Sequence, residues 1–278
     1  MRYSLAKASN LQQRVLASIT GGAVFILAIW FNEWTYFILF LTLLVLAMLE
    51  FYRLLGTTGY RPNRFIGLSM GIALYVVNFF GWKLASPATD DLYYLIFAIG
   101  GILFIAELFR NRPGPFINIA FTLLGVLYIA LPFSMLHELA YFQTASYSSQ
   151  LVLGVFFLIW ASDSGAYFIG RQFGRHKLFE RISPGKTWEG FVGGFLTAVL
   201  LGYALAHLFT DYDLKHWLVM AAGVAIFGAL GDLVESMLKR SLEVKDSGNF
   251  LPGHGGVLDR FDALLLAVPF VVVLLRFF

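Results

Sequence analysis

Aspartates lie in or beside strongly apolar segments of this chain of 278 residues, where a charge is costly. Asp163 stands inside the apolar run 151–170, and a carboxylate within a membrane-spanning segment usually marks a functional site. Asp232 lies in a second run, and Asp259 opens the last one. For Asp163 the alternative is a carboxylate that a neighbouring helix neutralises for packing alone. These three residues are the first candidates for chemistry.

The segment around Asp232 carries four polar side chains on one helical face. They occupy positions i, i+3, i+4 and i+7 and are Asp232, Glu235, Ser236 and Lys239. This spacing places them on one face, because a helix turns once in about 3.6 residues. A polar stripe that runs from an apolar helix into a basic loop is typical of a cavity wall rather than of a surface that faces lipid.

A polar loop before residue 190 combines a turn with a cation. Its sequence is Ser183-Pro184-Gly185-Lys186-Thr187-Trp188-Glu189-Gly190. The N–H groups and hydroxyls of such a turn, with Lys186 just before a helix N-terminus, suit a phosphate. The glycine spacing is not that of a Walker loop. Taken alone, a capped turn before a helix explains this loop better, so the phosphate interpretation depends on the neighbouring motifs.

A glycine-rich segment precedes the last apolar run. It consists of Lys245-Asp246, the turn Pro252-Gly253-His254-Gly255-Gly256, and Asp259-Arg260-Phe261-Asp262. Glycines let a backbone approach a ligand closely, and Asp259 and Asp262, spaced i,i+3, share a helical face. The helix dipole also favours carboxylates at a helix start. That effect explains one of the two acids but not the whole run.

These motifs together describe a site for a polyphosphate. If the helices cross a membrane, Asp163, Asp232 and Asp259 fall at comparable depth, beside two loops rich in lysine and arginine. Clustered carboxylates with oxygen-only neighbours favour a hard cation, Mg²⁺ above all, over zinc. Such a cation and basic residues neutralise the charges that oppose attack on a phosphoryl centre. The chain has no cysteine, which excludes a thiolate nucleophile and a cysteine metal site.

The same residues resemble the signature of the phosphatidate cytidylyltransferase (CDP-diacylglycerol synthase) family. The matching stretches are Ser236-Met237-Leu238-Lys239-Arg240, Lys245-Asp246-Ser247-Gly248 and Leu251-Pro252-Gly253-His254-Gly255-Gly256-Val257-Leu258-Asp259-Arg260-Phe261-Asp262. The segments 163–167 and 183–190 also look like motifs of that family. The resemblance covers roughly residues 150–278, whereas the first half of the chain matches only as a hydrophobic region of several helices.

The resemblance implies transfer of a cytidylyl group from CTP to phosphatidic acid, which yields CDP-diacylglycerol and pyrophosphate. In that family the reaction needs Mg²⁺, a K⁺ ion can share the site, and the enzyme is a homodimer whose site opens to both cytoplasm and bilayer. By motif position, Asp232 and Asp259 would bind the metal, with Ser236 nearby and Asp163 as an addition. No nucleic-acid partner is expected.

Further roles follow from the same resemblance. The catalytic set would be Asp232, Asp259, Lys239 and Arg240. Substrate contacts would come from Ser183, Lys186, Thr187, Ser236, Lys245, Asp246, His254 and Arg260, with Arg260 facing the lipid phosphate. His254 fits an acid and a hydrogen-bonding partner of its own loop equally well. Because a phosphate monoester has a second pKa of about 6, no strong base is needed, and catalysis would be positioning and charge neutralisation.

The elements that must position these residues are membrane-spanning helices. The chain is 59% hydrophobic and only 13% charged, whereas a soluble domain is about 25% charged. A spanning helix needs about 20 mostly apolar residues, and the runs do not alternate as barrel strands do. The predicted runs are 13–31, 34–55, 65–82, 92–109, 115–136, 151–170, 190–209, 216–238 and 257–278. Pro132 lies inside the fifth run and is expected to disturb it.

The basic residues test this assignment independently. Of the 20 lysines and arginines, only Lys83, Lys215 and Arg276 fall on the opposite set of loops and the C-terminus. Because such residues stay on the cytoplasmic side during insertion, the chain is predicted to be an all-α polytopic membrane protein with about nine helices. Its N-terminus would be cytoplasmic and its C-terminus external. The protein would be located in a bacterial inner membrane.

The chain is further predicted to divide near residue 150. Residues 1–149 would form an N-terminal transmembrane region, and residues 150–278 a catalytic region with its site on the cytoplasmic side. The cytoplasmic loops of the catalytic region would be 171–189 and 239–259.

Two short segments of the first half share one pattern. Glu50 and Glu107 each precede an aromatic residue and an arginine, Arg53 and Arg110, at the end of an apolar run. An i,i+3 ion pair at the lipid headgroup level is the expected explanation, and a role in holding an anionic lipid is the alternative.

Two other functions would also account for part of these sequence features. A secondary transporter also uses buried acids, but its site tends to lie at the midplane between paired repeats, whereas these acids gather toward one face. Another CTP-using lipid enzyme, acting on an ether-lipid phosphate or a polyprenol, would share the nucleotide chemistry and differ in a lipid pocket that the sequence does not reveal.

Overall fold

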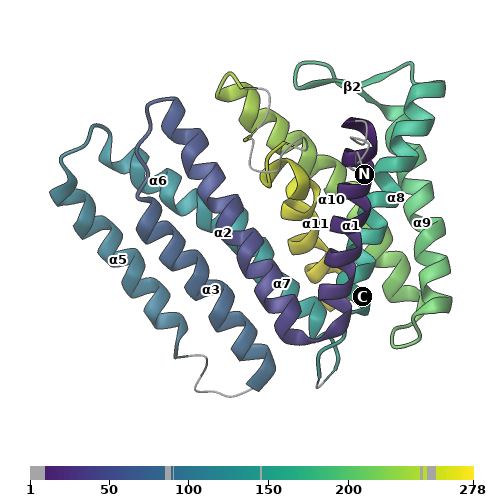
Figure 1. Ribbon diagram of the computed structural model, residues 1–278, viewed down its shortest axis with the longest axis horizontal. Coiled ribbons are helices and arrows are strands. Elements are labelled where there is room, and N and C mark those ends of the chain that lie inside the picture. The colour runs from purple at the N-terminus through teal and green to yellow at the C-terminus, as the bar shows by residue number, and fades with distance from the viewer. Residues whose placement is uncertain (1–9, 85–88, 90, 145, 245–246, 249–254) are drawn as a thin grey trace, which may run out of the picture.

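The computed structural model describes residues 10–84, 89, 91–144, 146–244, 247–248 and 255–278, with residues 10–19 described by their backbone alone. Helices form most of this part of the chain (Figure 1). They are α1 (Asn10–Phe31), α2 (Glu33–Thr57), α3 (Arg64–Leu84), α5 (Tyr93–Arg110), α6 (Pro115–Gly125), η1 (Val126–Ala130), α7 (Leu131–Ala140), α8 (Gln150–Phe173), α9 (Trp188–Leu208), α10 (Leu214–Ser241) and α11 (Leu258–Phe277).

Each apolar run predicted from the sequence falls on a helix. Within the described residues, seven helical segments are long and apolar enough to cross a membrane, with α6, η1 and α7 acting as one. Large apolar side chains such as Phe97 and Leu108 of α5 are exposed, which suits contact with lipid. The prediction of an all-α polytopic membrane protein is confirmed, while the number of nine spans and the sides of the termini stay predictions.

The fifth predicted run changes its helical geometry beside its proline. At the end of η1 the N–H of Leu131 donates to the carbonyl of Val126, five residues back, as in a π-helix. Pro132 follows directly, has no N–H to donate, and would crowd the carbonyl four residues before it. A π turn absorbs this strain without ending the helix. The expected disturbance is therefore a local change of winding.

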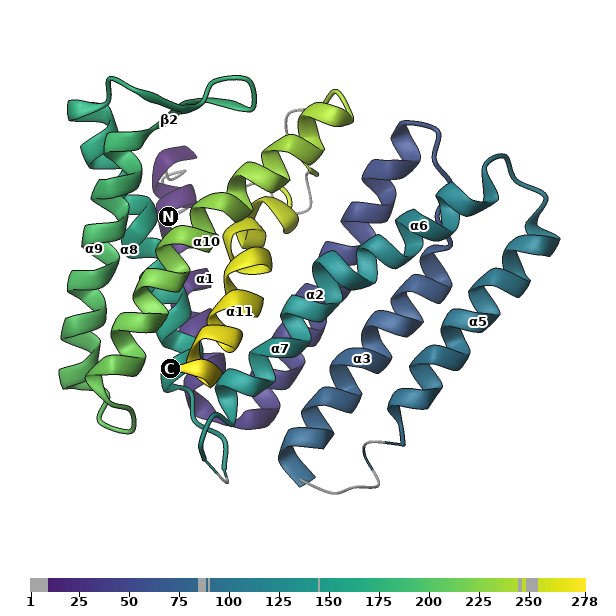
Figure 2. The ribbon, with the colours of Figure 1, turned by 180° about the vertical axis from the view of Figure 1, so that it is seen from behind.

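Two groups of helices stand side by side (Figures 1 and 2). Helices α8, α9, α10 and α11 pack on one another, and α2, α3, α5, α6 and α7 form the second group. The groups meet where α11 contacts α7 and α2, and where α1 contacts both α2 and α8. The boundary predicted at residue 149 falls just before α8, and the division into two regions stays a prediction.

Aromatic rings fill the junction between the two groups. The ring of Phe261, near the start of α11, lies 5.7 Å from that of Phe133 in α7 and 6.2 Å from that of Phe156 in α8. Phe133 and Phe156 belong to the buried core. Because tilted and edge-to-face ring pairs of this kind add to the energy of burial, the first turn of α11 is held from both sides.

The predicted cytoplasmic loops share one end of the molecule. The α2–α3 and α5–α6 loops, the connection from α8 to α9, and the facing ends of α10 and α11 lie together at the top of Figure 1. The end of α3, the start of α5, and the α7–α8 and α9–α10 connections lie at the other end. This is the arrangement that the alternating basic loops predict.

One small β-hairpin departs from the purely helical expectation. Strands β1 (Lys177–Phe179) and β2 (Ser183–Thr187) pair antiparallel, with Lys177 opposite Thr187. The segment Ser183-Pro184-Gly185-Lys186-Thr187 was expected to be a turn and is instead the second strand. Both strands are short and project beyond the helices (Figure 1), so pairing satisfies backbone groups that no helix could satisfy.

Candidate active site

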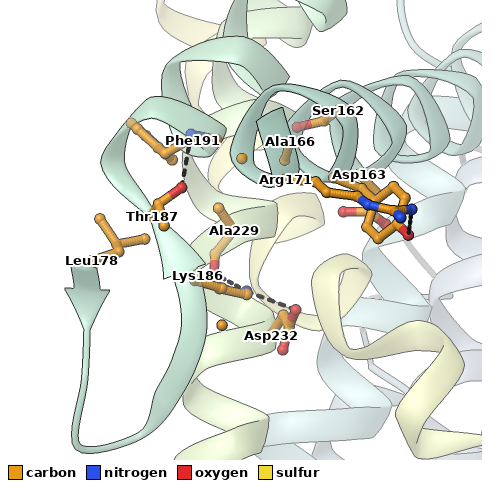
Figure 3. A pocket seen from close by; sticks show the side chains of 14 residues that line it. Ser162, Asp163, Ala166, Arg171, Leu178, Lys186, Thr187, Phe191, Ala229 and Asp232 are labelled. Atoms are coloured by element: carbon orange, nitrogen blue, oxygen red, sulfur yellow. Dashed lines mark hydrogen bonds and ion pairs between the residues drawn. The ribbon is translucent and has the colours of Figure 1, made fainter. Parts of the chain in front are cut away.

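A pocket of about 430 Å³ opens between α8, the hairpin, α9 and α10. It is called here the carboxylate–lysine pocket. Its lining residues are Ser162, Asp163, Ala166, Tyr167, Gly170, Arg171, Leu178, Gly185, Lys186, Thr187, Gly190, Phe191, Ala229 and Asp232. Figure 3 shows Lys186 extending from β2 toward Asp232 on α10, with Asp163 contributed by α8. Three sequence motifs that lie far apart in the chain thus meet at one cavity.

Two residues that line this pocket form an ion pair. The Nζ atom of Lys186 lies 2.6 Å from Oδ2 of Asp232 and donates to the carbonyl oxygen of Ala229 at 3.3 Å (Figure 3). The hydroxyl of Ser236 donates to Oδ1 of the same aspartate at 3.3 Å. The side chain of Asp232 is 38% exposed, and a solvent-accessible ion pair is weak. Lys186 can therefore exchange the carboxylate for the phosphate of a ligand.

A third aspartate lies next to the helix that carries Asp232. Asp163 and Asp232 line the pocket, and the backbone of Asp262 in α11 packs against Gly231 of α10. Helices α10 and α11 cross tightly here, because a Cβ on Gly231 would stand only 2.6 Å from the carbonyl oxygen of Asp262. Asp262 was not assigned to the site from the sequence, although its i,i+3 spacing from Asp259 was a usable signal.

The donor set of the pocket fits a magnesium ion. Among the described residues no three acidic or histidine side chains form a ready-made metal cluster. Magnesium does not need one, since it usually binds through one or two carboxylates, waters and the phosphates of a substrate. Asp163 and Asp232 supply carboxylate oxygens to a single cavity, and Ser236 adds a hydroxyl beside Asp232. These are hard oxygen ligands of the type that this cation prefers.

Thr187 has the structural role that its loop alone suggested. It is the N-cap of α9, and its Oγ1 accepts the N–H of Gly190 at 3.2 Å. Glu189 closes the base of the hairpin by accepting the N–H groups of Arg175 and His176 at 3.1 and 3.2 Å and pairing with Nδ1 of His176 at 2.6 Å. The capped turn and the cation are compatible, since the cap fixes the backbone while Lys186 points into the pocket.

Asp259 lies in a second cluster at the start of α11 and is not among the lining residues of the carboxylate–lysine pocket. Its carboxylate accepts Nζ of Lys239 at 2.9 Å and the N–H groups of Ser247 and Gly256 at 3.2 and 3.0 Å. Lys239 also pairs with the buried Glu235. Asp259 therefore links Ser247 and Gly256 to Lys239 of α10. Its predicted role as a metal ligand, and the predicted role of Lys239 in charge balance, stay predictions.

Glu50 of α2 has a structural role that the sequence interpretation missed. It was expected to pair with Arg53, but the structure gives no such ion pair between these two described residues. The buried carboxylate of Glu50 instead accepts the N–H groups of Val257 and Leu258 at 2.8 and 3.2 Å and the hydroxyl of Ser247. It thereby caps α11 from a helix about 200 positions earlier in the chain.

The fit around Glu50 explains one glycine of the signature. A Cβ at Gly256 would collide with Oε1 of Glu50 and Oγ of Ser247. Only glycine lets the backbone pass this close to the carboxylate. The local spacing of Glu50 suggested an ordinary surface ion pair. Its real partners lie far away in the sequence, so no local spacing could reveal them.

The remaining predicted residues lie around these two clusters. Ser183 is half-buried in β2, and Arg240 and Arg260 are exposed at the end of α10 and the start of α11. Lys245, Asp246 and His254 lie outside the described residues, so their predicted roles stay predictions. Arg171 was missed as a site residue. It lines the pocket, donates to the hydroxyl of Tyr167 at 3.1 Å, and lies on the face of Asp163 at the spacing i+8.

Comparison with known proteins gives one family and a consistent set of relatives. A sequence model described as the cytidylyltransferase family matches residues 12–278. A phosphatidate cytidylyltransferase of Staphylococcus saprophyticus is 41% identical over 176 residues, and proteins of the same name from Staphylococcus aureus and Staphylococcus epidermidis are 40% and 41% identical over the same length. The match covers 63% of this chain, and the chain spans 65% of the length of these relatives.

Proposed function

The chain belongs to the cytidylyltransferase family, and we propose that it acts as a phosphatidate cytidylyltransferase. It would transfer the cytidylyl group of CTP to phosphatidate and release CDP-diacylglycerol and pyrophosphate. The observation that carries this proposal is the carboxylate–lysine pocket, where Lys186 and Arg171 stand beside Asp163 and Asp232. The relatives, one of which is 41% identical to this chain over 176 aligned residues, support the same chemistry.

The proposed reaction is a single in-line displacement. An oxygen of the phosphatidate phosphate attacks the α-phosphorus of CTP, a new P–O bond forms, and the bond from the α-phosphorus to the bridging oxygen breaks. Pyrophosphate leaves with the electron pair of that bond. The attacking phosphate is largely dianionic near neutral pH, since its second pKa is about 6, so the protein needs neither a covalent intermediate nor a strong general base.

The basic residues of the pocket would hold the nucleotide. Lys186 can turn from Asp232 to a CTP phosphate, because the ion pair between them is solvent-accessible. Arg171 presents a guanidinium, which binds phosphate oxygens through paired N–H donors. Arg240 and Arg260, both exposed at the same end of the molecule, would bring further positive charge to the triphosphate and to the lipid phosphate.

A magnesium ion would be held by Asp232 and Asp163, with Asp259 as a predicted further ligand. When bound, this ion neutralises phosphate charge and polarises the reacting phosphoryl group. A K⁺ ion as a second cation also belongs to the proposal. The carboxylates must stay charged for this role, and Ser236 orients Asp232 through its hydrogen bond.

The polar end of the protein would face the cytoplasm. The α2–α3, α5–α6 and hairpin loops that share this end carry arginines and lysines (Figure 1), and such residues remain cytoplasmic during membrane insertion. With bacterial relatives, the proposed location is a bacterial inner membrane. A homodimer is proposed from the family resemblance, and the mass of the protein in detergent would test it.

The deciding experiment is pyrophosphate release by purified protein in detergent. Mg²⁺, CTP and phosphatidate are supplied together and then omitted one at a time, and the lipid product is identified by mass spectrometry. Release that requires all three components, with CDP-diacylglycerol formed, supports the proposal. A folded protein that releases pyrophosphate only with another lipid phosphate, such as an ether-lipid or polyprenyl phosphate, would replace the substrate. No release with any of them would reject the reaction.

A further inference from the structure

A second cavity lies at the same end of the protein, in the N-terminal group of helices. It has a volume of about 810 Å³ and lies where α2 and α5 end and α3 begins. Its lining residues are Leu49, Tyr52, Arg53, Gly56, Thr57, Tyr60, Arg61, Pro62, Asn63, Arg64, Phe65 and Arg110. It is called here the arginine pocket. Four of these residues are arginines and none is acidic, so the cavity concentrates positive charge.

Most of this charge has no acidic partner among the residues that the structure describes. Arg110 pairs with Glu107 at 2.7 Å. Within the described part of the chain, Arg53, Arg61 and Arg64 form no ion pair with any acid. The guanidinium of Arg64 lies 5.1 Å from the ring centre of Phe65. Three like charges around one hollow repel one another, and an anion in the cavity would relieve that repulsion.

The walls of the arginine pocket are rigid. The N–H of Arg61 donates to Oδ1 of Asn118 at 2.9 Å, and its carbonyl accepts a guanidinium N–H of Arg110 at 3.0 Å. The N–H of Asn63 donates to Oγ1 of Thr122 at 2.7 Å. Asn118 and Thr122 are buried polar residues of α6. Buried polar side chains of α6 thus fix the backbone of the loop from which the exposed side chains of Arg61 and Arg64 extend.

The surroundings indicate an amphiphilic ligand. Leu49 and Phe65 line the pocket beside the arginines, and the ring of Phe65 is 70% exposed, as is usual for an apolar side chain that contacts lipid. Arginine binds phosphate oxygens in a bidentate manner and is less strongly hydrated than lysine. The arginines lie at the ends of three apolar helices and have apolar side chains next to them. This arrangement suits the phosphate headgroup of an anionic lipid.

We propose that the arginine pocket binds the phosphate headgroup of an anionic membrane lipid. The site is separate from the carboxylate–lysine pocket and shares none of its lining residues. With no carboxylate in its lining, it would bind the phosphate directly rather than through a metal ion. The ligand chemistry, a phosphate ester, is shared with free phosphate, and the experiment distinguishes the two.

The test is native mass spectrometry of the full chain in detergent, titrated with phosphatidylglycerol and, in parallel, with phosphatidylcholine. Phosphatidylglycerol is not the proposed substrate, so this test does not depend on the enzyme activity. The pocket variant is Arg61→Gln/Arg64→Gln. The matched control is Arg112→Gln/Arg181→Gln, which removes the same charge from positions outside both pockets.

The pocket variant is expected to weaken phosphatidylglycerol binding by about tenfold or more, the scale of losing hydrogen bonds to a charged group, while the control variant binds like the native protein. Equal weakening in both variants would overturn the proposal, because it would show an unspecific effect of net charge. Displacement of the lipid by millimolar inorganic phosphate, with no preference for phosphatidylglycerol over phosphatidylcholine, would also overturn it in favour of a free-phosphate site. If the double variant fails to fold, Arg53→Gln tests the same wall of the pocket.

Discussion

The two pockets at the polar end of this protein differ in one respect that decides what they can do. The carboxylate–lysine pocket combines Lys186 and Arg171 with Asp163 and Asp232, whereas the arginine pocket holds four cations and no acid in its lining. A cavity lined by cations alone can retain an anion. A cavity that adds carboxylates can also hold a divalent cation, and so can change the charge on a phosphoryl group during a reaction. Its mixed charge is therefore the reason for proposing the first pocket as the site of chemistry.

Removal of divalent metal should separate the two pockets most strongly. With EDTA in excess, pyrophosphate release should fall to background, because the carboxylates of the first pocket then have no cation to present to CTP. Phosphatidylglycerol binding at the arginine pocket should not change. Both are measured on one preparation, and Mg²⁺ is then added back as the control. Pyrophosphate release that survives chelation would remove the metal from the proposed reaction.

Asp232→Asn should remove one of the two carboxylates that distinguish the first pocket from the second. Turnover is expected to fall by at least about 100-fold, the scale of losing one group that stabilises transition-state charge, because the metal loses a carboxylate and Lys186 loses its partner. The measurement is initial rate at saturating Mg²⁺ and CTP, with thermal unfolding to verify the fold. Asp259→Asn is the companion variant. If either variant keeps most of the native turnover, the aspartate that it replaces is not a metal ligand.

Glu50→Gln should show that the first pocket depends on a residue of the other helix group. The carboxylate accepts two backbone N–H groups and one hydroxyl, and glutamine can satisfy only part of that set. We expect about 1–3 kcal/mol lower stability and turnover reduced by about 10- to 100-fold, as for outer partners that orient a site.

The matched control is Glu107→Gln. Glu107 binds Arg110 and Asn118, away from α11, and this variant should lose stability without a comparable loss of turnover per folded molecule. Rates are normalised to the folded fraction, and Glu50→Asp tests partial rescue. Equal effects of the two glutamine variants on normalised turnover would show that Glu50 does not position the site.

Arg61→Gln/Arg64→Gln should have the smallest effect on the reaction. Pyrophosphate release is expected to change by less than about fivefold, since exposed charges contribute about 0–1 kcal/mol and neither residue lines the first pocket. The assay uses phosphatidate in detergent at saturating concentration. A loss as large as that of Asp232→Asn would mean that the two pockets form one functional site.

The two glutamates with the same local pattern show where prediction from sequence succeeds. Glu107 pairs with Arg110 at the expected i,i+3 spacing. Glu50 has the same spacing from Arg53 but binds the start of α11. A local pattern predicts a partner one helical turn away, and it fails when packing brings a stronger set of donors to the same carboxylate.

The sequence by itself determined the parts of this protein that depend on local composition and period. Apolar runs predicted the helices because lipid excludes unpaired backbone groups, and the spacing of Asp232 and Ser236 placed them on one face of α10. A costly charge inside such a run identified Asp163 as a candidate, and a cation in a turn just before a helix identified Lys186. Tertiary structure alone decided that Lys186 reaches Asp232, that Asp259 accepts the N–H groups of Ser247 and Gly256, and that Glu50 caps α11. These contacts depend on how helices cross, and no spacing along the chain encodes the distance between two helices.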